Sequence, residues 1–142
     1  MKTFKPVTPS NRYKVWNTFE EITKTTPEKS LLRVKKRSGG RNNQGRITCR
    51  HIGGGHKQKY RVIDFKRKIT DLEATVVGIE YDPNRTCRIA LIEYKGGDKA
   101  YILAPVGLEV GATVVSSETA APKPGNATTL KNVPLVTSIH NI

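Results

Sequence analysis

The stretch ATVVGIEYDPNRTCRIALIEY, residues 74–94, decides the fold. Two runs rich in Val, Ile and Tyr, 74–82 and 87–94, flank the turn residues Asp82–Pro83–Asn84. Such residues favour strands, and turn residues between two such runs predict that the strands pair. One alternate set of side chains in the first run is interpreted as the core-facing side: Thr75, Val77, Ile79 and Tyr81.

Three further short apolar runs lie on either side of this stretch, at residues 60–65, 99–105 and 112–117. Turn residues such as Gly96–Gly97–Asp98 separate them. Five strands at a spacing of roughly 12–14 residues, with almost no helix, predict a mainly β chain folded as a small antiparallel barrel.

The flanking segments predict little regular structure. Thr18 and Glu21 fit a capping box, which predicts a short helix that ends at about Lys24, before Pro27. Residues 28–59 show no sustained period, so an external partner is expected to organise them. Two more strands are expected, one near residues 127–130 and one beginning in 136–142.

Positive charge is concentrated in the first half of the chain. Residues 1–68 contain 19 Lys or Arg and four acids, whereas residues 69–142 contain six and eight. Within 40–68 there are nine Lys or Arg and one acid, Asp64. Cations neutralise phosphates, and glycines let backbone N–H groups approach them. We therefore predict a nucleic-acid partner, and favour folded RNA because no recognition helix for duplex DNA is expected.

Other kinds of site are poorly supported. The spacing of Cys49, His51 and His56 matches no zinc signature, and both cysteines, Cys49 and Cys87, are interpreted as reduced thiols. The run 53–57 lacks the rest of a nucleotide-binding loop. No apolar run is long enough to span a membrane. Acids of the second half are expected at turns or strand exteriors, on a solvated face without catalytic function: Asp71, Glu73, Glu80, Asp82, Glu93 and Asp98.

A long run now becomes recognisable. SGGRNNQGRITCRHIGGGHKQKYRVIDFKR, residues 38–67, followed by EYDPNRTCRIALIEY, YILAP and GNATTLKNVPLVTSIHN, closely resembles the bacterial-type large-subunit ribosomal protein L-two family, from about Thr8 onward. The resemblance implies a basic, largely irregular N-terminal extension (1–59) and a five-stranded OB-type barrel (60–130). It also implies that residues 131–142 begin a connection to an SH3-like domain that this sequence lacks.

The resemblance also implies which residues contact RNA. Arg85 matches an exposed basic residue of the turn after Asn84, and Lys66 begins the basic exit from the first barrel strand. The full set of expected RNA-binding residues is Arg37, Arg41, Arg46, Arg50, His51, Gly53, Gly54, Gly55, His56, Lys57, Lys59, Tyr60, Arg61, Lys66, Arg67, Lys68 and Arg85.

We therefore expect a non-enzymatic, structural component of the large ribosomal subunit in the cytoplasm. Its expected partners are ribosomal RNA and neighbouring ribosomal proteins, without a cofactor, metal, membrane or small-molecule substrate. An extraribosomal OB module that binds single-stranded nucleic acid is the alternative. The sequence leaves open whether the ribosome is bacterial or organellar, which rRNA helices are contacted, and whether the chain is part of a longer protein. A role in peptidyl transfer is not assigned.

Overall fold

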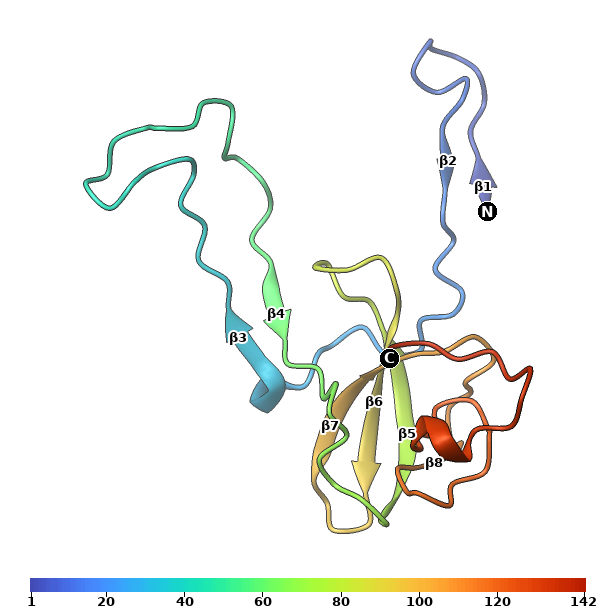
Figure 1. Cartoon of the computed structure of the whole chain (residues 1–142). Coiled ribbons are helices and arrows are strands. Elements are labelled where there is room, and N and C mark those ends of the chain that lie inside the picture. The colour runs from blue at the N-terminus through green and yellow to red at the C-terminus, as the bar shows by residue number, and fades with distance from the viewer.

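The computed structural model describes all 142 residues and is mainly β. A curved four-stranded sheet forms the body, and two arms extend from it (Figure 1). The sheet contains β5 (Glu73–Glu80), β6 (Ile89–Tyr94), β7 (Lys99–Leu103) and β8 (Thr113–Val115). All neighbours are antiparallel, in the order β7-β6-β5-β8.

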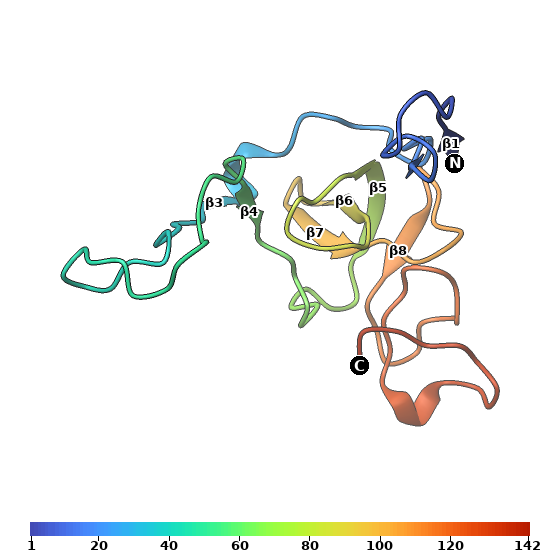
Figure 2. The ribbon, with the colours of Figure 1, turned by 90° about the horizontal axis from the view of Figure 1, so that it is seen from above.

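Two short ribbons form the arms. The N-terminal hairpin contains β1 (Lys2–Thr3) and β2 (Val15–Trp16), and the basic arm contains β3 (Leu32–Val34) and β4 (Lys59–Arg61). Seen from above, they leave the body at separate places (Figure 2). Two three-residue 3-10 helices, η1 (Lys29–Leu31) and η2 (Leu130–Asn132), complete the elements.

The sheet differs from the expected barrel at the first predicted strand. Residues 60–65 do not form one strand, because Lys59–Arg61 pairs with β3 of the arm. Only Ile63 then bridges Tyr101 of β7, in parallel. The sheet therefore has four strands, and its edges, β7 and β8, do not pair with each other.

The core lies on both faces of β6. One face packs Ala90, Ile92 and Tyr94 against neighbouring strands and Leu108. The other face forms a smaller cluster of Ile63, Ile89, Leu91 and Tyr101, which Leu31 from the foot of the basic arm also covers. Full burial of such side chains contributes roughly 1.5–3 kcal/mol each. The arm is thus attached to the body through apolar contacts.

The predicted core face of β5 is wrong. Ala74, Val76, Gly78 and Glu80 are buried, whereas Thr75 and Val77 point outward. Small residues suit the buried side because bulky neighbours fill the space there, and because another segment crosses the strand at Gly78. A Cβ on Gly78 would lie 3.1 Å from the Cβ of Lys24.

The same crossing explains why the helix predicted after Thr18 does not form. The backbone N–H groups of Thr23 and Lys24 both donate to the carbonyl of Ile79, at 3.1 Å. Those donors are therefore used against β5 and not within a helix. The strands expected near 127–130 and in 136–142 are also absent, although Ala127 forms an isolated bridge to Ser116.

Candidate nucleic-acid interface

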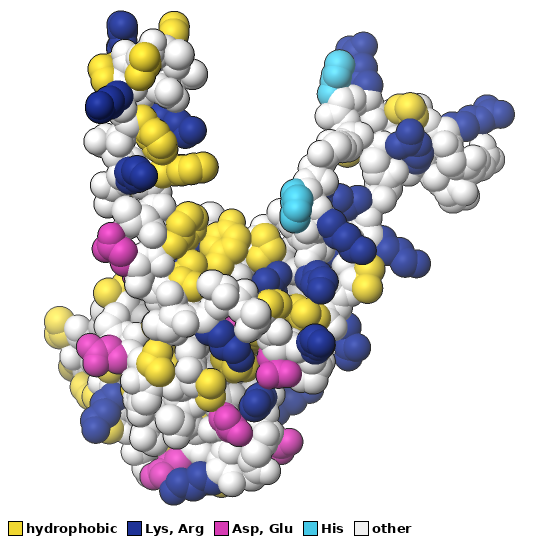
Figure 3. All heavy atoms as spheres, turned by 180° about the vertical axis from the view of Figure 1, so that it is seen from behind, with side chains coloured by type: hydrophobic (Ala, Val, Ile, Leu, Met, Phe, Trp, Pro, Cys, Tyr) yellow, Lys and Arg dark blue, Asp and Glu magenta, His cyan; other side chains and the backbone are white.

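The basic arm, residues 29–63, is the most strongly charged part of the molecule. It contains eleven Lys or Arg and no Asp or Glu. Lys and Arg side chains are spread along it, whereas acidic side chains gather on the body (Figure 3). With no acid on the arm, its positive potential is not neutralised locally, which favours a polyanionic partner.

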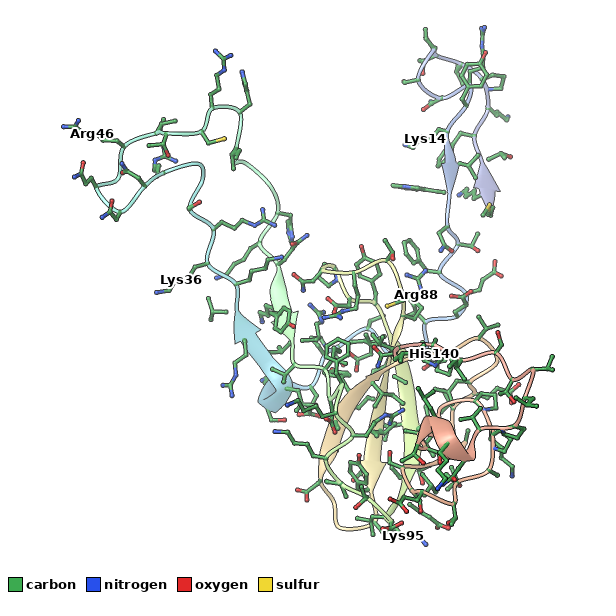
Figure 4. All side chains as sticks on the ribbon, viewed as in Figure 1. Lys14, Lys36, Arg46, Arg88, Lys95 and His140 are labelled. Atoms are coloured by element: carbon green, nitrogen blue, oxygen red, sulfur yellow. The ribbon has the colours of Figure 1, made fainter.

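The end of the arm is a small hydrogen-bonded hairpin. Arg41 and Ile47 form an antiparallel bridge, and the Asn42 side chain accepts bonds from the N–H groups of Gln44 and Arg46, both at 3.0 Å. The carbonyl of Gly40 accepts a bond from Cys49 N–H at 3.1 Å. The expectation that residues 28–59 lack regular structure is therefore wrong for β3 and this hairpin. Figure 4 shows Arg46 at the far end of the arm.

A hollow of ≈ 420 Å³ lies beside the glycine run. Lys36 and Arg37 line one side of it, and Gly53 and Gly55 contribute backbone to the other. Positive charge and side-chain-free backbone suit a phosphate group, since amides can approach its oxygens without obstruction. Lys36 is a residue that the sequence interpretation omitted.

Most of the expected RNA-binding residues are exposed. The exceptions are Arg61, Arg67 and Arg85, which are partly covered. Arg61 donates to the carbonyl of Lys59 at 2.8 Å, and Arg67 donates to that of Gly125 at 2.7 Å. Burial lowers the pKa of Arg67, although Tyr94 and Asp64 oppose that effect. Arg61 therefore contacts the arm itself, whereas Arg67 contacts the loop that follows β8.

Arg85 corrects the expectation of an exposed cation, because only 18% of its side chain is accessible. Its Nε donates to Oδ2 of Asp82 at 2.6 Å, and Asp82 is fully buried. Oδ1 of Asp82 accepts two bonds from Asn84, each at 2.9 Å. The Asn84 side chain also donates to the carbonyl of Lys59 at 2.9 Å and accepts from Lys35 at 3.1 Å. This turn therefore fastens the arm to the sheet.

Two buried acids contradict the prediction of a solvated acidic face. Burial raises the pKa of Glu80, which accepts a 2.8 Å bond from Tyr101. Burial would also raise the pKa of Asp82, but bonds from Asn84 and Arg85 lower it below its usual range. Burial raises the pKa of Tyr101, whose hydroxyl also accepts the N–H of Glu28 at 2.8 Å. Correct assignment of the buried side of β5 would have revealed both acids.

Other chemistry finds little support in the geometry. Cys49 and Cys87 are exposed and unpaired. No three His, Cys, Asp or Glu side chains lie close enough to hold a metal ion. None of the helices has the length and apolar character needed to cross a bilayer.

The sequence of this chain matches one family model and several curated proteins. The family model described as "Ribosomal Proteins L2, RNA binding N-terminal domain" matches residues 28–116. Among curated proteins, the chain is 72% identical to "Large ribosomal subunit protein uL2" of Akkermansia muciniphila over all 142 residues, which are 51% of that protein. Proteins of the same name from Parabacteroides distasonis and Bacteroides thetaiotaomicron are 58% and 56% identical over the whole chain. The chain covers 52% of each of these two, so it spans about half the length of its curated relatives.

Proposed function

Because the chain belongs to the L2 family of ribosomal proteins, matched through that family's RNA-binding N-terminal domain, we propose that it is a structural part of the large ribosomal subunit. In this role it binds ribosomal RNA and supports subunit assembly and translation without catalysing a reaction. Its partners are rRNA and neighbouring ribosomal proteins. The named relatives come from bacteria, which supports a location in the ribosomes of a bacterial cytoplasm.

One observation carries the proposal: eleven cations and no acid lie on a single arm that is fixed to the sheet. The exposed cations of its outer part neutralise phosphates, and the hollow beside Gly53 receives one of them. The hydrogen bond from Asn84 to Lys59 and the packing of Leu31 set the direction of the arm. The partner is therefore recognised by its shape and backbone charge.

We also propose that three parts of the chain have different roles. Residues 1–59 act as the extension that inserts between RNA segments, residues 60–130 as an OB-type platform, and residues 131–142 as a connection. The parallel bridge of Ile63 to Tyr101, with Asp64 N–H donating to the Tyr101 carbonyl at 2.8 Å, supports counting Ile63 and Asp64 with the platform, whereas Tyr60 and Arg61 pair with β3 of the arm.

The RNA-binding residues carried into the proposal are those exposed on or beside the arm. They are Arg37, Arg41, Arg46, Arg50, His51, Gly53, Gly54, Gly55, His56, Lys57, Lys59, Tyr60, Lys66 and Lys68, joined by Lys36. Arg61 and Arg85 are assigned the role of holding the arm in place, and Arg67 that of holding the segment after β4 against the loop that follows β8.

The first test is the salt dependence of binding to transcribed large-subunit rRNA. If roughly six to ten phosphates are engaged, affinity falls by on the order of 10³–10⁵ between 50 and 200 mM salt. A filter-binding titration measures this. An affinity that is flat with salt would contradict phosphate neutralisation.

A second test separates the arm from total charge. Replacing Arg46, Arg50 and Lys57 with Ala should weaken rRNA binding and reduce the salt slope by about three. The matched control replaces Lys95, Lys123 and Lys131, which are exposed on the body. Both triple variants remove three positive charges, so equal losses would mean that net charge and not the arm binds RNA.

Co-sedimentation distinguishes the ribosomal role from the extraribosomal alternative. The native protein should travel with large subunits through a sucrose gradient at physiological salt. A protein found only in free fractions would instead favour a module that acts outside the ribosome.

A further inference from the structure

The loop that joins β5 to β6, residues 81–88, carries two arginines that each pack against a pair of aromatic rings. Arg88 lies 5.0 Å from the ring centre of Phe19 and 5.7 Å from that of Tyr81. The two rings meet edge to face, with centres 5.7 Å apart. Phe19 remains 43% exposed and Tyr81 46% exposed.

Arg85 repeats this arrangement on the other side of the loop. Its guanidinium lies 5.9 Å from the ring centre of Tyr60 and 5.7 Å from that of Phe65. Both rings are again partly open to solvent, at 37% and 48%. We call the surface formed by Phe19, Tyr60, Phe65, Tyr81, Arg85 and Arg88 the aromatic saddle.

The aromatic saddle lies between the feet of the two arms. The loop rises from the body between them (Figure 1), and Arg88 lies near the foot of the N-terminal hairpin (Figure 4). Hydrophobic side chains gather on the body in this region (Figure 3). Positive charge lies along both arms, because residues 1–19 contain four Lys or Arg and no acid, and the basic arm contains eleven Lys or Arg and no acid. Glu20 and Glu21 are the acids next to Phe19, at the foot of the N-terminal hairpin.

The backbone of Phe19 adds a second observation. Its φ is 57°, in the left-handed region that residues with a side chain seldom adopt. This conformation sets the ring against Tyr81, yet nearly half of the ring stays open to solvent. The backbone of Phe19 therefore presents an aromatic surface without burying it fully.

We propose that the aromatic saddle binds unpaired bases of RNA. This inference rests on the proposed function and adds a subsite to it. Half-exposed rings offer faces on which bases stack, and the adjacent guanidiniums add cation–π contacts. The exposed cations of the two flanking arms attract the connecting phosphates. Duplex RNA presents its bases already stacked, so the saddle favours single-stranded segments. The flanking positive charge selects a polyanion over a neutral or cationic partner.

Two aromatic variants with one control test the inference. Phe19→Leu and Tyr81→Leu retain apolar contacts but remove the stacking faces, whereas Tyr13→Leu removes a ring that is 84% exposed in the N-terminal hairpin. The probes are a fluorescein-labelled 12-nucleotide oligouridine and a 12-base-pair RNA duplex, titrated by anisotropy. Each saddle variant should bind the single strand about tenfold more weakly, with the duplex affinity and the Tyr13→Leu affinity unchanged.

A second readout reports base stacking directly. An oligonucleotide with one 2-aminopurine loses fluorescence when that base stacks, so the wild-type protein should quench it and Tyr81→Leu should not.

A third variant should have the opposite effect on single-strand affinity. Glu21 Oε2 lies 3.4 Å from Arg88 Nε, and Glu21→Gln should strengthen single-strand binding because it removes a negative charge beside the phosphate path.

The outcomes separate the two proposals. Unchanged single-strand affinity in Phe19→Leu and Tyr81→Leu, with salt-dependent rRNA binding intact, overturns the saddle inference and points to a protein as the partner of these rings. If the wild-type protein binds no RNA, not even large-subunit rRNA, the proposed function is overturned as well.

Discussion

Asp82→Asn is the sharpest test of how the arm is attached. Asp82 is fully buried and holds Asn84 through Oδ1 and Arg85 through Oδ2. Asparagine has nearly the same shape, and its oxygen can still accept the bonds from Asn84. Its amide nitrogen, however, is a donor and would face the donor Nε of Arg85. The substitution therefore removes one charge and leaves a covered guanidinium without its partner.

The expected loss of stability follows from the environment of Arg85. Removing one partner of a buried ion pair costs roughly 3–5 kcal/mol. Because 18% of the Arg85 side chain is accessible, water compensates in part, and the value should approach that of a hydrogen bond to a charged group. We expect Asp82→Asn to lower the free energy of unfolding by about 2–3 kcal/mol.

Urea unfolding followed by far-UV circular dichroism measures this change. The midpoint should fall by on the order of 1–2 M for a slope of about 1.5–2 kcal/mol per M. Arg85→Met added to Asp82→Asn removes the unpaired charge and keeps contact with the rings, so the double variant should regain part of the loss. Asp98→Asn makes the same substitution at an exposed turn, so it is the control and should leave the urea midpoint nearly unchanged.

The pH dependence supplies an independent check. The pKa of Asp82 is lowered in the folded protein. The ionised carboxylate therefore stabilises the fold at pH values above the ordinary aspartate pKa of about 3.9, and this stabilisation is lost as the pH falls through the folded pKa. Asp82→Asn should flatten this acid limb. A variant that loses less than about 0.5 kcal/mol and keeps the wild-type acid limb would refute the assigned role of the turn.

Three further predictions concern other positions. Burial raises the pKa of Glu80, so the free energy of unfolding of the wild-type protein should decline as the pH rises from about 4.3 through the folded pKa. Urea titrations at several pH values measure this decline, which Glu80→Gln should lack. Gly40 has a φ of +73°, and a Cβ there would overlap the carbonyl oxygen of Cys49, so Gly40→Ala should open the hairpin at the end of the arm and weaken rRNA binding. Gly45→Ala, with a φ of +77° and no atom within 4 Å, is its control, and equal losses would mean that backbone strain alone matters. Trp16 is the only Trp and is 59% exposed, so its emission should stay nearly constant when urea unfolds the sheet but should be quenched by rRNA if the N-terminal hairpin contacts RNA.

Local composition predicted the strands of the sheet well, because each is a short run of β-branched residues between turn residues. β6, β7 and β8 lie within the predicted runs, and β5 begins one residue earlier than predicted. The charge imbalance predicted a nucleic-acid partner, whereas the motif within residues 38–67 carried the resemblance to the family that the family model shows.

Features that depend on distant partners could not be predicted in this way. Side-chain size on β5 suggested Val77 and Ile79 as core residues, but the volume of the core is supplied by other strands and by Leu108. The segment after Thr18 has a good helix start, but its N–H groups at Thr23 and Lys24 find an acceptor on Ile79, which is more than 50 residues away. β3 is only three residues long and becomes a strand because β4 lies beside it.

The arginines and lysines of this chain serve two purposes that the structure separates in space. Three partly covered arginines donate to protein oxygens: Arg61 and Arg85 do so near the foot of the arm, and Arg67 against the loop that follows β8. At its outer part, Arg46, Arg50 and Lys57 are exposed and form none of the five ion pairs. A cation that already donates to a carboxylate or carbonyl attracts fewer counterions, so it contributes little to the release that drives RNA binding. The acid buried at Asp82 therefore strengthens the attachment of the arm without reducing the charge of its outer part. Stability and RNA affinity consequently depend on different cations.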